Sequence, residues 1–270
     1  NTAYTSGGIT GLNNEAVTLN DTTLAVSVLN DLDGNTSGAI NANSINTLSG
    51  SAADLITAFE SGGINNLGDT AVSVNSGNAS TSQANALAAA TSAVVTATIS
   101  EGDMTTLAGL TETGNAYSIT ITDTTVAAAA LNTLDGKTSV AIDASDITTL
   151  TGAAADLNTA YTANGNGSIT GLGNEAATLS DTTLAVAVLN DLDGNTSGTI
   201  NANSINTLSG TAADLNTAYT SGGISNLGNE AVTLSDTSLT VSVLNALDGD
   251  TSGTINANSI NTLTGTAADL

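Results

Sequence analysis

The segment Thr199–Leu215, with the sequence TINANSINTLSGTAADL, recurs along the chain with few changes. Its other copies are Ala39–Leu55, Thr254–Leu270 and, more loosely, Val140–Leu157. A second recurring block, Glu175–Gly194, lies between the copies. The counterparts of this block are Glu15–Gly34 and Glu230–Gly249. Self-similarity at a regular interval is the signature of a repeat protein, and it decides how the rest of the sequence is interpreted.

Dividing the sequence after each ADL, or its equivalent, gives five predicted repeats. They are 1–55, 56–110, 111–157, 158–215 and 216–270. A repeat of about 55 residues contains two similar halves, so the unit has about 23–31 residues, the size of one solenoid coil. We therefore predict a single continuous solenoid over residues 1–270. Leu270 ends a TAADL block, and the sequence that follows TAADL at Asn216 is the same as the sequence that begins at Asn1. We therefore expect these 270 residues to be an excerpt of a much longer chain.

The strands are predicted from small aliphatic residues that return at the same places in each repeat. In Ile200-Asn-Ala202 the apolar side chains alternate with a polar one, which is typical of a strand with one buried face. Ile205 and Leu208 follow, and the same four positions recur in other repeats. The matching sets are Ile40, Ala42, Ile45, Leu48; Ile142, Ala144, Ile147, Leu150; and Ile255, Ala257, Ile260, Leu263. This end of the coil resembles the turn of a leucine-rich-repeat coil.

Two short helices are predicted in each repeat. Asp181-Thr182-Thr183 has the side-chain oxygens of a helix start, and the apolar residues that follow occupy one helical face. Those residues are Leu184, Val188, Leu189 and Leu192. Asp193-Gly194 is expected to end this helix, with glycine in the left-handed conformation. The second helix is expected over 210–219. The predicted fold class is thus a repeat solenoid: a parallel β-solenoid with short α-helices on one side.

The charge balance limits the partners. Lys137 is the only basic residue against 25 acidic ones, and the formal net charge is −24. Nucleic-acid binding requires Lys and Arg to displace counterions from phosphates, so we expect no nucleic-acid partner. No run of about 18 apolar residues is present, so we expect no membrane span. Cysteine is absent, so no disulfide is available. The charge is interpreted either as a source of solubility or as a sign of divalent-cation binding.

The acidic turns are candidate calcium sites. Asp191-Leu-Asp193-Gly-Asn resembles the opening of a calcium loop, but the bidentate acid that such a loop needs at its twelfth position is replaced by Ala202. Stacked turns could still bring carboxylates of neighbouring coils together, where Ca²⁺ would relieve their repulsion. The alternative is that these are solvated helix-end and turn acids. The candidate calcium ligands are Asp31, Asp33, Asp191, Asp193, Asp248 and Asp250.

Catalysis is not expected. The chain has no His and no Cys, so the usual general base and thiol nucleophile are missing. Lys137 lies in a turn where other copies carry Asn or Asp. Carboxylate pairs recur in every repeat, which indicates scaffold positions, because a catalytic site is normally singular. We therefore predict no enzyme activity, no catalytic residue and no cofactor apart from the calcium alternative.

Residues 98–143 are similar to repeats in very long acidic surface or secreted proteins of bacteria, marine cyanobacteria in particular. The resemblance implies an extracellular or cell-surface location and a structural or adhesive role. The first hypothesis is a repeat segment of an extracellular fibre, filament or surface layer, whose partner is itself or further copies of the same repeats. The alternative is an adhesin stalk or binding module with a Thr-rich face for ice or glycan. Thr96-Ala-Thr98 and Ser118–Thr122 show the alternation that such a face requires.

Overall fold

The computed structural model describes residues 1–268, and the last two residues of the predicted repeat 216–270 lie outside this range. The chain divides into two compact units. Unit 1 comprises Asn1–Ile121 and Thr133–Asp143, and unit 2 comprises Thr122–Asn132 and Ala144–Leu270. Each unit is described separately below. The single continuous solenoid expected from the repeats remains a prediction.

Unit 1 alternates short strands with short helices. Its helices are α1 (Thr2–Thr5), α2 (Val26–Asn35), α3 (Ala52–Glu60), α4 (Thr81–Ala90) and α5 (Met104–Leu107). Its strands are β1 (Val17–Thr18), β2 (Thr23–Ala25), β3 (Ile40–Asn41), β4 (Thr47–Gly50), β5 (Ile64–Asn65), β6 (Ala71–Val74), β7 (Val95–Thr98), β8 (Ala116–Ser118) and β10 (Ile142–Asp143).

Unit 2 follows the same plan. Its helices are α6 (Ala128–Asp135), of which the residues up to Asn132 belong to this unit, α7 (Ala154–Asn166), α8 (Val186–Asn195), α9 (Ala212–Thr220) and α10 (Val241–Asp250). Its strands are β9 (Thr125–Ala127), β11 (Thr149–Gly152), β12 (Ile169–Thr170), β13 (Ala176–Leu179), β14 (Thr183–Ala185), β15 (Ile200–Asn201), β16 (Thr207–Gly210), β17 (Ile224–Ser225), β18 (Ala231–Leu234), β19 (Ser238–Thr240), β20 (Ile255–Asn256) and β21 (Thr262–Thr264).

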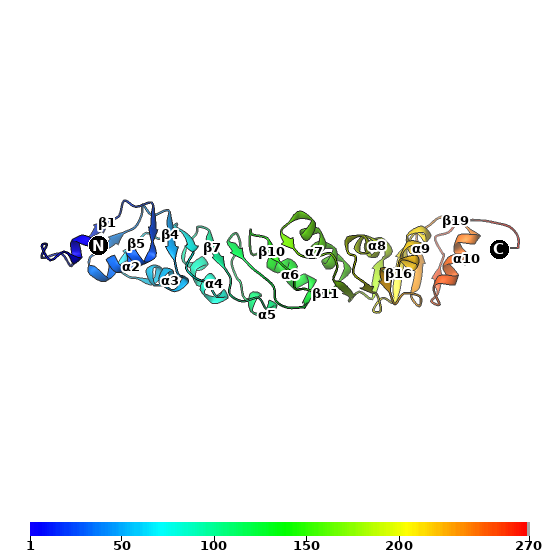
Figure 1. The fold of residues 1–270 in the computed structure, drawn as a ribbon. Helices are drawn as coiled ribbons and strands as arrows, with labels where there is room; N and C mark the ends of the chain where they lie inside the picture. The colour runs from blue at the N-terminus through cyan, green and yellow to red at the C-terminus, as the bar shows by residue number, and fades with distance from the viewer. Residues whose placement is uncertain (269–270) are drawn as a thin grey trace. The chain divides into compact units, whose positions relative to one another are not determined.

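The strands of successive coils pair in parallel and in register. In unit 1 the order of the largest sheet is β2-β4-β6-β7-β8, and Leu24, Leu48 and Val72 are aligned across its first three strands. In unit 2 the sheets run β9-β11-β13-β15-β17 and β14-β16-β18-β20. The same apolar position therefore returns beside its own copy in the next coil, and small aliphatic side chains form the core. Parallel strands alternating with helices give a repeating, solenoid-like α/β arrangement (Figure 1).

The predicted core positions are confirmed in three of the four sets. In the fourth set Leu263 is 36% exposed, and Ile255, Ala257 and Ile260 are half-buried. Ile200, Ala202 and Leu208 are each 0% exposed, and Ile205 is 2% exposed. Ile200 lies in β15 and Leu208 in β16, and between them the amide of Ile205 donates to the carbonyl of Ala202 at 3.0 Å. A turn thus separates two strands, because the chain changes direction to wrap around the core.

The predicted start of the first helix is wrong. Thr183–Ala185 forms strand β14, and α8 begins only at Val186. The buried residues of α8 are Val186, Leu189 and Leu192. Gly194 lies inside the helix and has no positive φ, so the expected left-handed helix end is also wrong. The sequence of Thr183–Ala185 is compatible with a strand and with the first turn of a helix. Pairing with β16 favours the strand.

The second helix is confirmed. It is α9 in one repeat and α3 in another, and Leu55 and Leu215 face the core at 0% exposure. Within unit 1, α2, α3 and α4 follow one another beside the strands, and each packs against the next (Figure 1). Among residues 1–268, no helix combines the length and the hydrophobicity needed to cross a bilayer.

Candidate functional site

The acidic residues that precede the first helix cap a different helix. In unit 2, Asp181 accepts a hydrogen bond at 2.8 Å from the amide of Ala154, the first residue of α7. Asp236 does the same for Ala212 of α9, at 2.7 Å. The predicted role of Asp181 as a cap for the helix that follows it is therefore wrong. Each carboxylate instead satisfies a free amide of the preceding coil and complements the positive end of its helix dipole.

Asparagine side chains connect neighbouring helices. In each case the side-chain amide donates to a backbone carbonyl exactly one coil later, 24 residues along the chain. The four bonds are Asn30 to Asp54 (3.0 Å), Asn85 to Gly109 (2.7 Å), Asn132 to Asp156 (2.9 Å) and Asn190 to Asp214 (3.0 Å). Each bond therefore joins the helix of one coil to the backbone of the next coil.

Threonine hydroxyls make a third connection between coils. Each of these threonines follows the first helix of a repeat and donates to a backbone carbonyl 21 residues earlier. The bonds are Thr36 to Glu15 (3.1 Å), Thr91 to Thr70 (2.7 Å), Thr138 to Tyr117 (2.7 Å) and Thr251 to Glu230 (2.9 Å). Because the same hydrogen bond recurs at the same offset, these hydroxyls are a regular link to the backbone of the adjacent coil.

Two glutamates are buried in unit 2, at 1% exposure for Glu175 and 0% for Glu230. The Glu230 carboxylate accepts from the amides of Gly228 (2.8 Å) and Asn229 (3.2 Å), and from the hydroxyl of Tyr219 (3.3 Å). All three donors reach the same oxygen, Oε2, while Oε1 is buried without a partner. Backbone amides rather than a basic side chain thus hold this charge.

The tyrosines beside these glutamates resist ionisation. Burial is the main cause that raises the pKa of Tyr219 to about 12, and the nearby charges of Glu230 and Asp250 add to it. Burial likewise raises the pKa of Tyr161 to about 12, with a further contribution from Glu175. Each phenol therefore stays neutral and able to donate a hydrogen bond throughout the physiological range.

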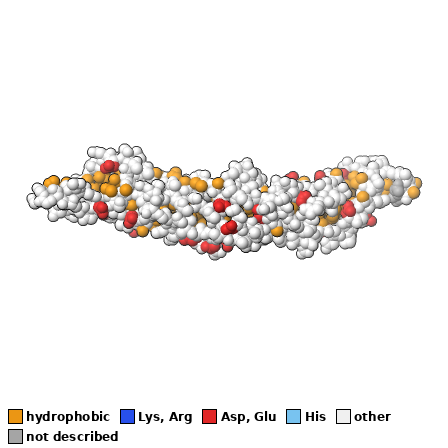
Figure 2. Space-filling model, viewed as in Figure 1, with side chains coloured by type: hydrophobic (Ala, Val, Ile, Leu, Met, Phe, Trp, Pro, Cys, Tyr) orange, Lys and Arg blue, Asp and Glu red, His pale blue; other side chains and the backbone are white. Residues whose placement is uncertain are grey.

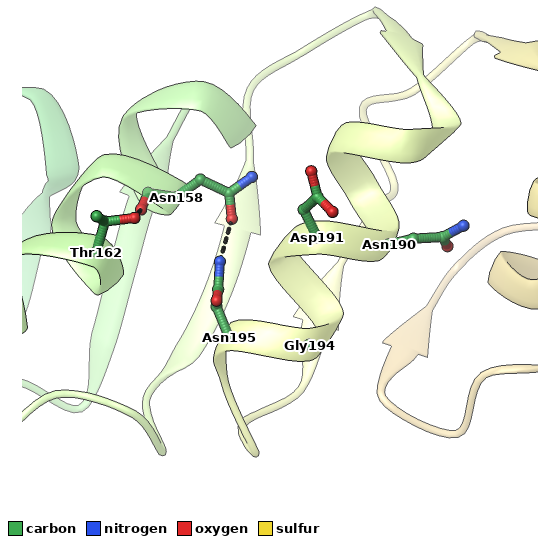
Figure 3. A pocket seen from close by; sticks show the side chains of 6 residues that line it. All are labelled: Asn158, Thr162, Asn190, Asp191, Gly194 and Asn195. Carbon is green, nitrogen blue, oxygen red and sulfur yellow. Dashed lines mark hydrogen bonds between the residues drawn. The ribbon is translucent and has the colours of Figure 1, made fainter. Parts of the chain in front are cut away.

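An open groove in unit 2 lies between α7 and α8 (Figure 3). Its volume is about 440 Å³. The lining residues are Asn158, Thr162, Asn190, Asp191, Gly194 and Asn195. Asn158 holds the groove in shape, since it donates to the Val188 carbonyl at 3.1 Å and accepts from Asn195 at 2.9 Å. In Figure 3 Asp191 extends from α8 toward α7, whereas Asn190 points to the other side.

This groove offers hydrogen bonds and a single negative charge. Asn and Thr groups can donate to and accept from hydroxyl groups, and Asp191 can accept from them. A nucleophile with an adjacent base is not among its lining residues. The arrangement is therefore chemically suited to weak binding of a polyhydroxylated ligand.

The candidate calcium ligands do not form a loop. Asp31 and Asp33 lie in the last turns of α2, and Asp191 and Asp193 lie in the last turns of α8. Two residues apart on a helix are separated by about 200° around its axis, so the two carboxylates of a pair point to different sides. The similarity to the opening of a calcium loop is therefore misleading, because helical pairing of the backbone competes with loop formation.

Two of the six candidates already have hydrogen-bonding partners. Asp33 accepts from the hydroxyl of Ser61 at 2.7 Å in unit 1, and Asp193 accepts from Ser221 at 2.7 Å in unit 2. A glycine two residues beyond each serine leaves room for the carboxylate, and a Cβ at Gly63 would overlap Asp33. These two aspartates thus tie the end of one helix to the turn after the next one.

The other candidates are dispersed. Asp31 and Asp191 are exposed, Asp248 lines a shallow cavity near the end of unit 2, and Asp250 ends α10. Within residues 1–268, no three acidic, His or Cys side chains are grouped so that they could hold a metal ion. In the view of Figure 2, acidic side chains lie scattered among uncharged polar ones.

The buried glutamates were missed by sequence reasoning, although a signal was present. Glu15, Glu175 and Glu230 each stand 21 residues before a threonine and 23 residues before a glycine. A Cβ on the glycine would overlap the glutamate carbonyl, so the two positions are sterically linked. A fixed pairing of an acid with a distant glycine indicates contact between coils.

Comparison with known proteins gives no relative. No protein-family model, no curated protein and no solved structure matches this chain.

Proposed function

We propose that this chain is a structural protein, a repeat segment of an extracellular fibre, filament or surface layer that performs no catalysis. In this proposal the repeats form one continuous parallel β-solenoid with helices along one side. Each repeat adds two coils, and the body lengthens with every coil. The natural partners are the same repeats, in this chain or in other copies.

The observation that carries the proposal is the use made of the polar side chains. Asparagines, threonines and helix-capping carboxylates recur at offsets of 21 to 27 residues, and they bond to the backbone of an adjacent coil. Repeated nearest-neighbour bonding is how solenoids gain stability, roughly in proportion to the number of coils. Because these polar groups stabilise the stacking of coils in repeat after repeat, they support a structural role. A catalytic site would instead be expected at one place in the chain.

The composition supports an exposed location. A net charge of −24 keeps repeated surfaces apart and soluble, and it disfavours nucleic acid as a partner. With Lys137 as the only basic residue, trypsin-like proteases find one cleavage site in the chain. The resemblance that we propose for residues 98–143, to long acidic bacterial surface repeats, would agree with this location.

The test is negative-stain electron microscopy of the native material, extracted from the cell surface or the medium and labelled with an antibody against residues 158–215. The expected result is long threads or a layer of uniform width. Discrete particles carrying the label would contradict a fibre or layer.

A second candidate is an adhesin stalk or binding module, and the polar groove between α7 and α8 favours it (Figure 3). Its amide groups and the Asp191 carboxylate suit sugar hydroxyls, although no aromatic ring lines it for stacking. The test is a glycan array, followed by NMR titration of any hit against the native chain and Asp191→Ala. Binding lost in the variant would support this role, and a blank array would reject it.

A further inference from the structure

The repeat 158–215 carries an insertion that the repeat 216–270 lacks. Between the tyrosine of the second helix and the isoleucine of the next strand, it has three residues more. The extra residues lengthen α7, which has 13 residues where α9 has 9. The lengthened end reads Ala-Asn-Gly-Asn-Gly-Ser over residues 163–168, and it contains both Asn-Gly pairs of the chain. We call residues 163–168 the inserted segment.

An asparagine that precedes a glycine is the kind most prone to spontaneous deamidation. The backbone nitrogen of the glycine attacks the side-chain carbonyl carbon of the asparagine, and no Cβ obstructs its approach. In a folded protein, the asparagine side chain must also be able to turn, and the next amide must leave its hydrogen bond. The structure distinguishes the two candidates, Asn164 and Asn166, on these requirements.

The side chain of Asn164 is held at both ends. Its amide donates to the Leu172 carbonyl at 3.2 Å, and its oxygen accepts from the Leu172 amide at 3.1 Å. The residue is half-buried, and the glycine that follows it, Gly165, lies within α7. Attack on Cγ would break both side-chain bonds and disrupt the helix, so the fold protects Asn164.

Asn166 is the last residue of α7, and it is exposed. Gly167 follows with a φ of 82°, and a Cβ added to it would meet nothing within 4 Å. The Gly167 amide caps the helix by donating to the carbonyls of Ala163 and Asn164. Because helix ends fray, this amide is released more readily than an amide inside α7. The open space around Gly167 leaves room for a ring to form.

Independently of the structural role proposed above, we infer that Asn166 is a site of spontaneous deamidation and that Asn164 is not. The Gly167 nitrogen gives its proton to a base in the solvent and bonds to Cγ of Asn166, and the side-chain nitrogen leaves as ammonia. The resulting succinimide ring then takes up one water molecule. Opening at one ring carbonyl yields aspartate, and opening at the other yields isoaspartate, in which the main chain passes through the side-chain carbon.

The new carboxylate lies next to the groove between α7 and α8. Asn158, Thr162 and Asn166 follow one another at intervals of four residues, so they share one side of α7. The first two line the groove, where Asp191 supplies the carboxylate already present. The new charge also lies at the negative end of the α7 dipole, so it should loosen the last turn of the helix. Deamidation would thus change both the charge of the groove and the order of its edge.

The test is peptide mapping by mass spectrometry of the chain after incubation in mildly alkaline buffer, with isoaspartate labelled by protein isoaspartyl methyltransferase. In the folded chain we expect Asn166 to be converted while Asn164 stays intact. The conversion should become faster as the pH rises, because the attacking nitrogen must lose its proton. In the urea-unfolded chain both residues should react at similar rates, since both precede glycine.

Two variants separate the reaction from its effect on the helix. Asn166→Gln should abolish the conversion, because the longer side chain closes a larger ring far more slowly. Asn166→Asp mimics one product and should speed amide hydrogen exchange at Ser168, whose amide donates to the Ala163 carbonyl at 3.1 Å. The matched control is Asn203→Asp, which adds the same charge at another exposed asparagine and should leave that exchange unchanged.

An Asn166 that stays intact in the folded chain would overturn the inference. Equal conversion of Asn164 and Asn166 in the folded chain would overturn it too, because the fold would then not discriminate between them. If Asn166→Asp and Asn203→Asp gave the same exchange at Ser168, the effect on the end of α7 would be wrong.

Discussion

Two regions of the molecule make the same connections between coils from different residues. The regular region, residues 175–253 of unit 2, follows the repeat text closely, and the divergent region, residues 70–111 of unit 1, does not. Asp236 caps α9 in the regular region, and in the divergent region Glu101 caps α4 through the amide of Thr81 at 3.0 Å. The position of the hydrogen bond is kept while the residue changes. The fold therefore requires a hydrogen-bond acceptor for the first amide of the helix, and either an aspartate or a glutamate of the next coil can supply it.

The strongest contrast concerns a glycine. Gly198 of the regular region has no space for a Cβ, because the carbonyl of Glu175 lies against it, whereas the equivalent position in the divergent region is Ala93. We expect Gly198→Ala to destabilise unit 2 by about 3 kcal/mol, the upper part of the range for overpacking. The change would be measured by urea unfolding monitored by circular dichroism.

The control for that prediction is Ala93→Gly, which should cost only about 0.5–1 kcal/mol through backbone entropy. If Gly198→Ala and Ala93→Gly had similar effects, the steric link between glutamate and glycine would be wrong.

The next largest effect is expected at the buried acid. Glu230→Ala removes the carboxylate that accepts from the amides of Gly228 and Asn229, and hydrogen bonds to a carboxylate contribute about 1.5–3 kcal/mol. The divergent region has Thr70 here, whose hydroxyl donates to the Ile45 carbonyl at 3.0 Å. Thr70→Val should therefore cost about 1 kcal/mol. Thermal melts of both variants test the difference, which would disappear if water replaced the carboxylate at no cost.

A smaller effect is expected at the helix caps. Asp236→Ala removes the acceptor for the first amide of α9 and should cost about 0.5–2 kcal/mol, as measured for other N-terminal caps. Amide hydrogen exchange should show faster exchange at Ala212. Asp31→Ala, at an exposed site, is the control and should change stability by less than about 0.5 kcal/mol. Equal effects in both variants would remove capping across coils as a cause of stability.

The asparagine connections should contribute similarly per bond in both regions. Asn190→Ala removes one bond, to the Asp214 carbonyl at 3.0 Å. Asn85→Ala removes two, one to the Gly109 carbonyl at 2.7 Å and one from the Thr111 amide at 3.1 Å. A loss of about 0.5–1.5 kcal/mol is expected for each bond removed. Urea midpoints compared with Asn203→Ala, which alters an exposed asparagine, measure this loss. A marked difference per bond between the two regions would show that the divergent coils are stabilised in another way.

The smallest effect concerns calcium. With Asp33 and Asp193 bonded to serines and the other candidates dispersed, we expect neither a chelator nor millimolar Ca²⁺ to change the melting temperature. Differential scanning calorimetry of the native chain tests this, with Mg²⁺ as the control for general screening of charge. A rise specific to Ca²⁺ would restore the hypothesis that stacked turns bind calcium.

The sequence predicted the parts of the fold that depend on burial alone. Repetition of Ile200, Ala202 and Leu208 identified the core, and the TAADL block identified α9. It failed where two conformations suit the same residues. Thr183–Ala185 became a strand because a neighbouring strand was available, and that neighbour lies 24 residues away. Asp181 was assigned to the wrong helix for the same reason, since its partner belongs to the preceding coil.

The candidate site was harder to predict than the fold. Spacing in the sequence placed Asp191 and Asp193 together, but a helix separates their side chains. Glu175 and Glu230 went unnoticed because an isolated acid between polar residues gives no sign of burial. Their fixed offset from a glycine becomes informative only once stacking of the coils is known.

Capping across coils also constrains the order of folding during synthesis. The first amide of α7 receives its carboxylate from Asp181, 27 residues later, so this helix is incomplete when it leaves the ribosome. Asp236 stands in the same relation to α9, with a lag of 24 residues. Each such helix therefore lacks its capping carboxylate until the next coil has been synthesised. The last coil of the growing chain is then the one without its cap. A pause in translation would leave that coil frayed and the earlier coils intact.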